Sequence, residues 1–131
     1  MRVLLIEDEP TTARAIELML TTEGFNVYST DLGEEGLDLG KLYDYDIILL
    51  DLNLPDTSGI DILKRIKENR FLKSTPVVVL TTTDDSHEIK RCYELGCNVY
   101  ITKPVNYESF ANAIRQLGLF FSVIKVPEAA L

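Results

Sequence analysis

The sequence alternates short strand-like segments with longer segments whose apolar residues recur at helical spacing. Five strand-like segments lie at about residues 3–6, 25–29, 46–50, 76–80 and 98–101. Short apolar runs that end in turn-forming residues indicate strands buried on both faces, and helices between them provide the crossovers of a parallel sheet. The chain is therefore predicted to be an α/β protein with helices on both faces of the sheet.

Composition limits the function classes. The chain has 131 residues, of which 46% are hydrophobic, which suits a single domain covering 1–131. A net charge of -8 argues against binding to nucleic acid or to an anionic membrane. No segment is long enough to span a bilayer, and the apolar start is too short for a signal peptide. Cys92 and Cys97 do not form a C-x-x-C pair, so we expect reduced thiols and a cytoplasmic location.

Polar residues follow the predicted strand ends. Because parallel strands end at a common edge, the topology predicts that these residues meet there. They are Glu7, Asp8, Asp51, Asn53, Thr81 and Lys103. Clustered carboxylates repel one another unless a cation lies among them, and an oxygen-only ligand set suits Mg²⁺. The lysine and the hydroxyl then indicate a site for an anionic group near Asp51, for which phosphoryl is the natural candidate.

Asp51 has a simpler alternative interpretation, namely that it only caps the helix that follows. Ser58 is the better cap for that helix, because Asp61 follows it at capping-box spacing. The functional interpretation of Asp51 is therefore favoured.

These residues carry a family resemblance. The chain resembles the CheY-like receiver domains of bacterial two-component response regulators over nearly its whole length. The shared motifs are the acid pair at Glu7, the D-x-N-x-P-x-x-S-G run from Asp51, a threonine at Thr81 and the Lys103-Pro104 pair. The resemblance implies a flavodoxin-like (βα)5 fold, doubly wound, with strand order 2-1-3-4-5.

The resemblance also implies roles for the clustered residues. Asp51 accepts a phosphoryl group from a phosphohistidine of a sensor histidine kinase or phosphotransfer protein. Asp8, Asp51 and the main-chain carbonyl of Asn53 hold Mg²⁺, and Glu7 acts partly through water. Lys103 pairs with the phosphoryl group. The domain catalyses its own phosphorylation and slow dephosphorylation but is not an enzyme acting on metabolites.

The resemblance further implies a conformational switch that responds to phosphorylation. Thr81 is expected to move towards the phosphoryl oxygens, and Tyr100 to turn inward behind it. The peptide bond before Pro104 is usually cis in the family. Two departures from the usual pattern are Glu7, where many relatives carry Asp, and Thr82, where Ala or Ser is common.

The resemblance differs between the two halves. Up to about Pro55 the chain is similar to the receiver of an alphaproteobacterial cell-cycle transcription regulator. From about Gly59 it is similar to stand-alone receivers that serve phytochrome-type kinases.

The C-terminal part carries more apolar residues than a small core can bury. An extended helix and tail are predicted from about 106, with Phe110 and Ile114 on the core face. A second apolar set follows and includes Phe120, Val123 and Ile124. An exposed apolar patch suggests a partner surface, and a symmetric homodimer is the simplest partner.

Three alternative functions have requirements that the sequence can be compared with. A Mg²⁺-dependent phosphohydrolase of the haloacid-dehalogenase type needs an acid where Asn53 stands. A flavodoxin-like cofactor binder needs a glycine-rich phosphate loop where Glu7 and Asp8 stand. A DNA-binding transcription regulator is consistent only if the chain is a receiver fragment of it.

Overall fold

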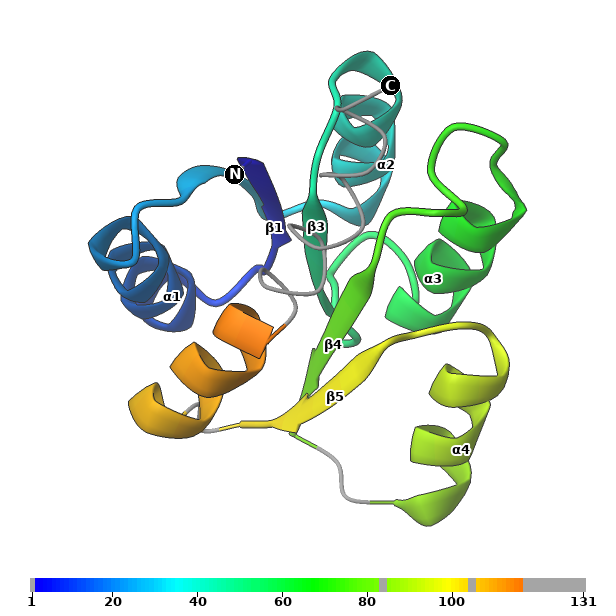
Figure 1. Cartoon of the computed structure of the whole chain (residues 1–131). Coiled ribbons are helices and arrows are strands. Elements are labelled where there is room, and N and C mark those ends of the chain that lie inside the picture. Colours follow the sequence, from blue (N-terminus) through cyan, green and yellow to red (C-terminus); the bar gives the residue numbers. More distant parts are fainter. Residues whose placement is uncertain (1, 83–84, 104–105, 117–131) are drawn as a thin grey trace, which may run out of the picture.

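The computed structural model describes residues 2–82, 85–103 and 106–116. Strands and helices alternate along the chain (Figure 1). The strands are β1 (Arg2–Ile6), β2 (Asn26–Thr30), β3 (Ile47–Asp51), β4 (Val77–Thr81) and β5 (Val99–Thr102). The helices are α1 (Pro10–Thr22), α2 (Gly33–Leu42), α3 (Gly59–Glu68) and α4 (Ser86–Glu94). Residues 107–116 are also helical and are called the last helix below.

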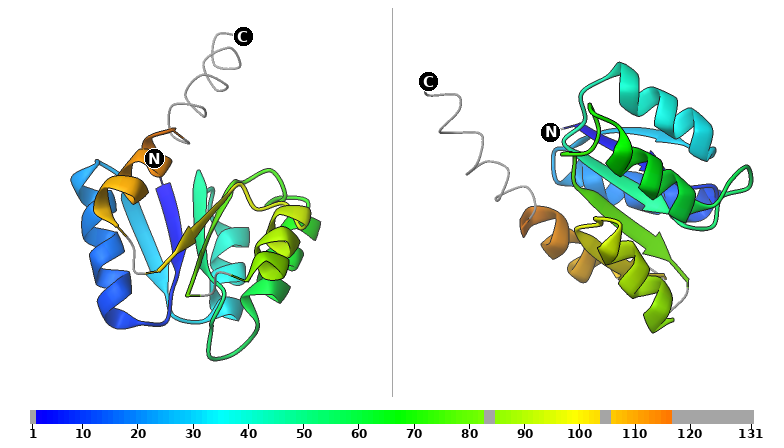
Figure 2. Two further views of the ribbon diagram at one scale, coloured as in Figure 1. Left: turned by 90° about the horizontal axis from the view of Figure 1, so that it is seen from below. Right: turned by 90° about the vertical axis from the view of Figure 1, so that its right-hand side faces the viewer.

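A single parallel sheet forms the middle layer. Its strand order is β2-β1-β3-β4-β5, which confirms the predicted doubly wound fold. Helix α1 and the last helix cover one face, and α2, α3 and α4 cover the other (Figure 1, Figure 2). The register pairs Ile6 with Leu50 and Thr81 with Thr102, so the carboxyl ends of these strands share one edge.

The core has two halves, one on each face of the sheet. Alternate residues of β1 supply both, with Leu4 on the side of α2 and Leu5 on the side of α1. Every residue of β3 and β4 is buried, because helices cover both faces of these central strands. Phe110 and Ile114 of the last helix are buried in the half beside α1, as predicted. Each such side chain contributes roughly 1.5–3 kcal/mol when fully buried.

Local structure marks where the helices begin and end, and the predicted Ser58 cap is confirmed. Gly24 and Gly96 follow α1 and α4 with φ of 86° and 106°, a backbone conformation that glycine adopts without steric cost. Ser58 accepts a hydrogen bond from the Ile60 N–H at the start of α3, and Asp85 accepts one from the His87 N–H at α4.

Two tyrosines that precede β3 differ in burial. Tyr45 is buried, at 9% exposure, whereas Tyr43 is 56% exposed. Tyr43 follows the end of α2 and lies outside both core clusters, whereas Tyr45 belongs to the half beside α2.

Some predicted features lie outside the described residues. They are the peptide bond before Pro104 and the proposed interface residues Phe120, Val123 and Ile124. Among the helices that are described, none has the length and apolar character needed to cross a membrane.

Candidate functional site

Three carboxyl groups meet at the carboxyl edge of the sheet. Glu7 and Asp8 follow β1 directly, and Asp51 is the last residue of β3. One ligand oxygen from each lies within 4.8 Å of the others. Glu7 and Asp51 are buried, whereas Asp8 is partly exposed and opens the cluster to solvent. The topology therefore brings together the acids that the sequence predicted at this edge.

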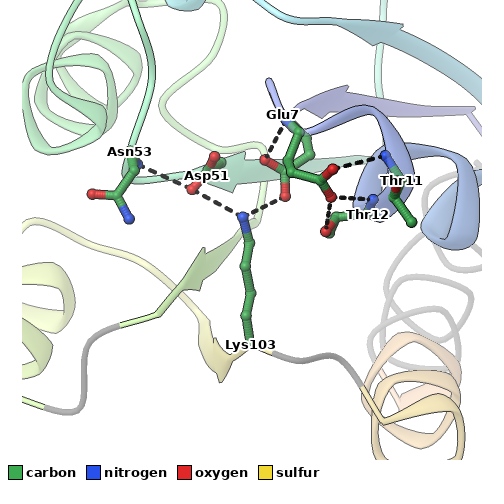
Figure 3. Close-up of polar contacts among 7 residues, drawn as sticks. Glu7, Thr11, Thr12, Asp51, Asn53 and Lys103 are labelled. Carbon is green, nitrogen blue, oxygen red and sulfur yellow. Dashed lines mark hydrogen bonds and ion pairs between the residues drawn. The ribbon is translucent and has the colours of Figure 1, made fainter.

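Lys103 supplies positive charge within the cluster. Its Nζ lies 2.5 Å from Oε1 of Glu7 and 3.3 Å from Oδ1 of Asp51. Figure 3 shows the lysine side chain reaching from the end of β5 to both acids. The Lys103 N–H donates to the Thr81 carbonyl oxygen over 2.7 Å, which fixes the lysine backbone beside β4. The sequence predicted that Lys103 lies here, but not that Glu7 is its nearer partner.

The pKa values in this cluster are shifted by burial and by the neighbouring charges. Burial raises the pKa of Asp51 to about 6, and the Glu7 carboxyl adds to the rise. Burial also raises the pKa of Asp8, with a further contribution from Asp51. Burial alone lowers the pKa of Lys103, but the Glu7 and Asp51 carboxylates outweigh it and the net shift is upward. The single positive charge of Lys103 does not balance the three carboxyl groups of the cluster.

The hydrogen-bond partners of the carboxylate oxygens indicate whether the cluster suits a cation. Asp51 Oδ1 accepts a hydrogen bond from the Asn53 N–H at 3.0 Å. Within the described residues, Asp51 Oδ2 and Glu7 Oε1 are buried without a hydrogen bond, although Glu7 Oε1 has its ion pair with Lys103. A buried oxygen without a partner is costly. The oxygen-only ligand set and the excess negative charge fit Mg²⁺.

The loop between β3 and α3, residues 52–58, lies beside the acids. It lines a groove of about 570 Å³ together with Asp8. Asn53 and Ser58 pair across the loop, which closes it. A Cβ on Gly59 would lie 2.3 Å from Cα of Leu52 and 2.6 Å from the Asp51 carbonyl oxygen. Only glycine therefore lets the chain turn this close to the end of β3.

The two predicted switch residues lie on adjacent strands. Thr81 is the last residue of β4 and is fully buried, and it pairs in register with Thr102 of β5. Tyr100 of β5 is partly buried and packs against the core half beside α4. Thr82, which follows Thr81, is exposed. Thr81 thus lies at the same strand edge as Asp51, one strand away.

Two acids near the site have contacts that sequence analysis did not predict. Glu9 caps α1, because its carboxylate accepts hydrogen bonds from the N–H groups of Thr11 and Thr12. The Asp56 carboxylate accepts hydrogen bonds from two N–H groups of α2. The spacing of Glu9 before Pro10 could have indicated the first contact, whereas no local signal indicates the second.

A second groove, of about 560 Å³, lies away from the acids. It is lined by residues of β1, β2 and α2 and by the segment before β3, including Arg2, Tyr28 and Tyr45. The Arg2 guanidinium lies 5.7 Å from the centre of the Tyr28 ring. None of the residues that line this second groove belongs to the cluster of Glu7, Asp8, Asp51 and Lys103.

Comparison with known proteins agrees with this geometry. The chain is 50% identical over 130 residues to the cell cycle transcriptional regulator CtrA of Caulobacter vibrioides, covering 95% of this chain and 55% of that protein. The chain thus spans about half the length of the curated relatives it matches.

Solved structures give the same result. A response regulator receiver domain from Rhodospirillum rubrum is 51% identical, with a TM-score of 0.77 and coverage of 94% of both chains. The phosphorylated cyanobacterial phytochrome response regulator RcpA is 32% identical, with a TM-score of 0.78 and coverage of 91% of both chains. Both kinds of receiver that the sequence resembles are thus among the matches, but the CtrA match covers 95% of the chain and the RcpA match 91%, so neither likeness is confined to one half.

The match to the family covers nearly all of the described fold. Residues 3–115 match the response regulator receiver domain. Receiver domains are in general signalling modules rather than enzymes. The acids, the lysine and the threonine lie at the strand ends of a fold shared with these proteins, and the chain therefore belongs to the response regulator receiver domain family, the phosphorylation-based signalling modules of two-component systems.

Proposed function

We propose that Asp51 is the phosphoacceptor of this receiver domain, with a phosphohistidine of a sensor histidine kinase or phosphotransfer protein as donor. The observation that supports it is Oδ2 of Asp51, a buried oxygen without a hydrogen bond among the described residues, at the end of a central strand. In the transfer, a carboxylate oxygen of Asp51 forms a bond to phosphorus as the bond from phosphorus to the histidine nitrogen breaks. The nitrogen leaves with the electron pair.

Mg²⁺ is the proposed cofactor. The carboxylates of Glu7, Asp8 and Asp51 and the main-chain carbonyl of Asn53 are its proposed ligands, supported by the cluster of three acids. When bound, the cation supplies positive charge that offsets the negative charge on the phosphoryl oxygens. Lys103 adds a second positive charge on the same side, and its contact with Asp51 supports this role.

The proposed switch connects Asp51 with Thr81 and Tyr100. Phosphorylation adds negative charge and strong acceptors at Asp51, and the Thr81 hydroxyl can donate to them. The position of Thr81 at the end of the next strand supports this role. Tyr100 then follows, since it packs beside α4 where a change at Thr81 can be transmitted.

The domain is proposed to promote its own phosphorylation and slow dephosphorylation in the cytoplasm, without acting on metabolites. The alternative of a phosphohydrolase remains unsupported because Asn53, two residues after Asp51, cannot act as a general acid.

Output is proposed to occur through protein contacts, with a homodimer formed by the C-terminal part and including Phe120, Val123 and Ile124. The apolar sequence of that part supports the proposal. Sedimentation of the wild type and of a Phe120→Asp, Ile124→Asp double variant tests it. If the wild type is monomeric both with and without phosphodonor, the proposed dimer interface is wrong. A receiver fragment of a DNA-binding regulator remains the second candidate, because the matched relatives are about twice as long as the match.

The test of the phosphoacceptor is intact mass after incubation with Mg²⁺ and a small acyl phosphate. The wild type is expected to gain one phosphoryl group, and Asp51→Asn is expected to gain none. Asp61→Asn is a matched control, since Asp61 is an exposed acid on α3. An adduct that persists on Asp51→Asn would place the modified residue elsewhere.

A further inference from the structure

The start of α2 is capped by a residue from a distant loop. The N–H groups of Gly33 and Glu34 donate to Oδ1 and Oδ2 of Asp56 over 2.9 and 3.0 Å. These are the first N–H groups of the helix, which have no partner within it. Leu32 occupies the N-cap position of α2 and makes no side-chain hydrogen bond there. Asp56 therefore does for α2 what a local N-cap residue does for most helices.

The same loop packs against the first residue of α2. A Cβ on Gly33 would lie 2.7 Å from Cγ2 of Thr57 and 3.0 Å from Cδ1 of Leu54. The two segments thus approach too closely for a side chain at this position. An ion pair between Arg65 of α3 and Glu34 of α2 lies beside this contact. The loop is therefore held to α2 by hydrogen bonds and by packing.

At its other end, the loop joins the cluster of acids. The Asn53 N–H donates to Oδ1 of Asp51, and Asn53 pairs with Ser58 across the loop. Residues 52–58 thus have one anchor at the acids and one at α2. The α2 N–H groups also keep the pKa of Asp56 below its usual value, so its carboxylate is charged and its hydrogen bonds are strengthened.

We propose that Asp56 is a positioning residue that couples cation binding at Asp51 to the stability of α2. The proposal rests on the proposed function, because it takes the main-chain carbonyl of Asn53 as a ligand. When Asp56 holds the loop to α2, the Asn53 backbone is held beside the acids. Coupling between two sites is reciprocal, so a bound cation stabilises the start of α2 by the same factor.

The size of the coupling follows from the cap. Loss of a good N-cap shifts a local equilibrium by about fivefold. If the docked loop is the state that binds the cation, the apparent Kd rises by the factor by which that state is depleted. We therefore expect a Kd for Mg²⁺ that is roughly two- to fivefold higher in Asp56→Ala than in the wild type.

The experiment uses the whole chain and two readouts. Titration with Mg²⁺ gives the Kd, and amide hydrogen exchange at Gly33 and Glu34 reports on the two donors directly. Mg²⁺ is expected to slow exchange at these amides in the wild type but not in Asp56→Ala. Asp56→Asn removes the same charge yet keeps an accepting oxygen, so it is expected to recover much of the affinity.

Controls separate positioning from charge. Asp61→Asn removes one exposed negative charge on the neighbouring helix α3 and makes no contact with the α2 N–H groups, so its Kd is expected to match the wild type. The coupling would be overturned if Asp56→Ala and Asp56→Asn had equal Kd values for Mg²⁺. It would also be overturned if Mg²⁺ left amide exchange at Gly33 and Glu34 of the wild type unchanged. A wild type that binds no Mg²⁺ would overturn the proposed function itself and the coupling with it.

Discussion

The Asp51 carboxylate is charged and buried. We therefore predict that an uncharged side chain at this position stabilises the metal-free protein. Asp51 is 1% exposed, and its pKa is raised from 3.8 to about 6. A pKa that is raised in the folded state means that the folded chain binds the proton more tightly than the unfolded chain. The contribution of Asp51 to the free energy of unfolding is therefore most favourable when its carboxyl is protonated. It falls as the pH rises from 3.8 to about 6.

The magnitude follows from the size of the shift. Each pKa unit corresponds to about 1.4 kcal/mol, so the ionised carboxylate costs up to roughly 3 kcal/mol near pH 7. Asp51→Asn has nearly the same shape and no charge, so it avoids that cost. We expect it to be more stable than the wild type by up to this amount, which corresponds to a rise in Tm on the order of 10 °C.

Urea and thermal unfolding near pH 7 with a chelator measure the difference. The advantage of Asp51→Asn is expected to disappear at about pH 4, where the wild-type carboxyl approaches full protonation in the folded state. It is also expected to shrink in saturating Mg²⁺, which stabilises only a chain that binds it. If Asp51→Asn were less stable than the wild type in chelator near pH 7, the contact with Lys103 would outweigh burial and the reasoning would be wrong.

Three further predictions concern single residues. Mg²⁺ at about a hundred times its Kd is expected to raise the stability of the wild type by about 2.7 kcal/mol and that of Asp8→Ala by much less, as measured by thermal melts; equal shifts would argue against a ligand at Asp8. Lys103→Ala is expected to keep or increase Mg²⁺ affinity in calorimetry, because a competing positive charge is lost, while uncoupling phosphorylation from conformational change; loss of Mg²⁺ binding would contradict the geometry. Gly59→Ala is expected to lose roughly 2 kcal/mol or more in urea unfolding, because its Cβ meets backbone atoms that cannot move aside; an unchanged midpoint would show that the turn relaxes.

The sequence by itself predicted the parallel α/β fold and the acids that meet at the carboxyl edge of its sheet. Apolar runs such as residues 47–50 and the turn-forming residues that end them are local, so periodicity and turn chemistry suffice to place strands and helices. Once the strands are parallel, their carboxyl ends lie at one edge. Chain topology then brings Glu7, Asp51 and Lys103 together without any knowledge of side-chain packing.

Only the tertiary structure decided which of these groups touch and how strongly. Lys103 lies nearer to Glu7 than to Asp51, a difference of under an ångström that depends on the register of β1, β3 and β5. The pKa of Asp51 depends on burial by both faces of the sheet, which no single segment encodes.

The cap of α2 is the clearest case of a contact that local sequence does not encode. Asp56 and the N–H group of Gly33 are separated by 23 residues, and nothing in either segment marks the other as its partner. Tyr43 and Tyr45 differ in burial for a related reason, because the end of α2 and the start of β3 together decide which ring reaches the core. Local patterns specify elements, whereas contacts between distant segments are set by the packing of those elements at distances of a few ångströms.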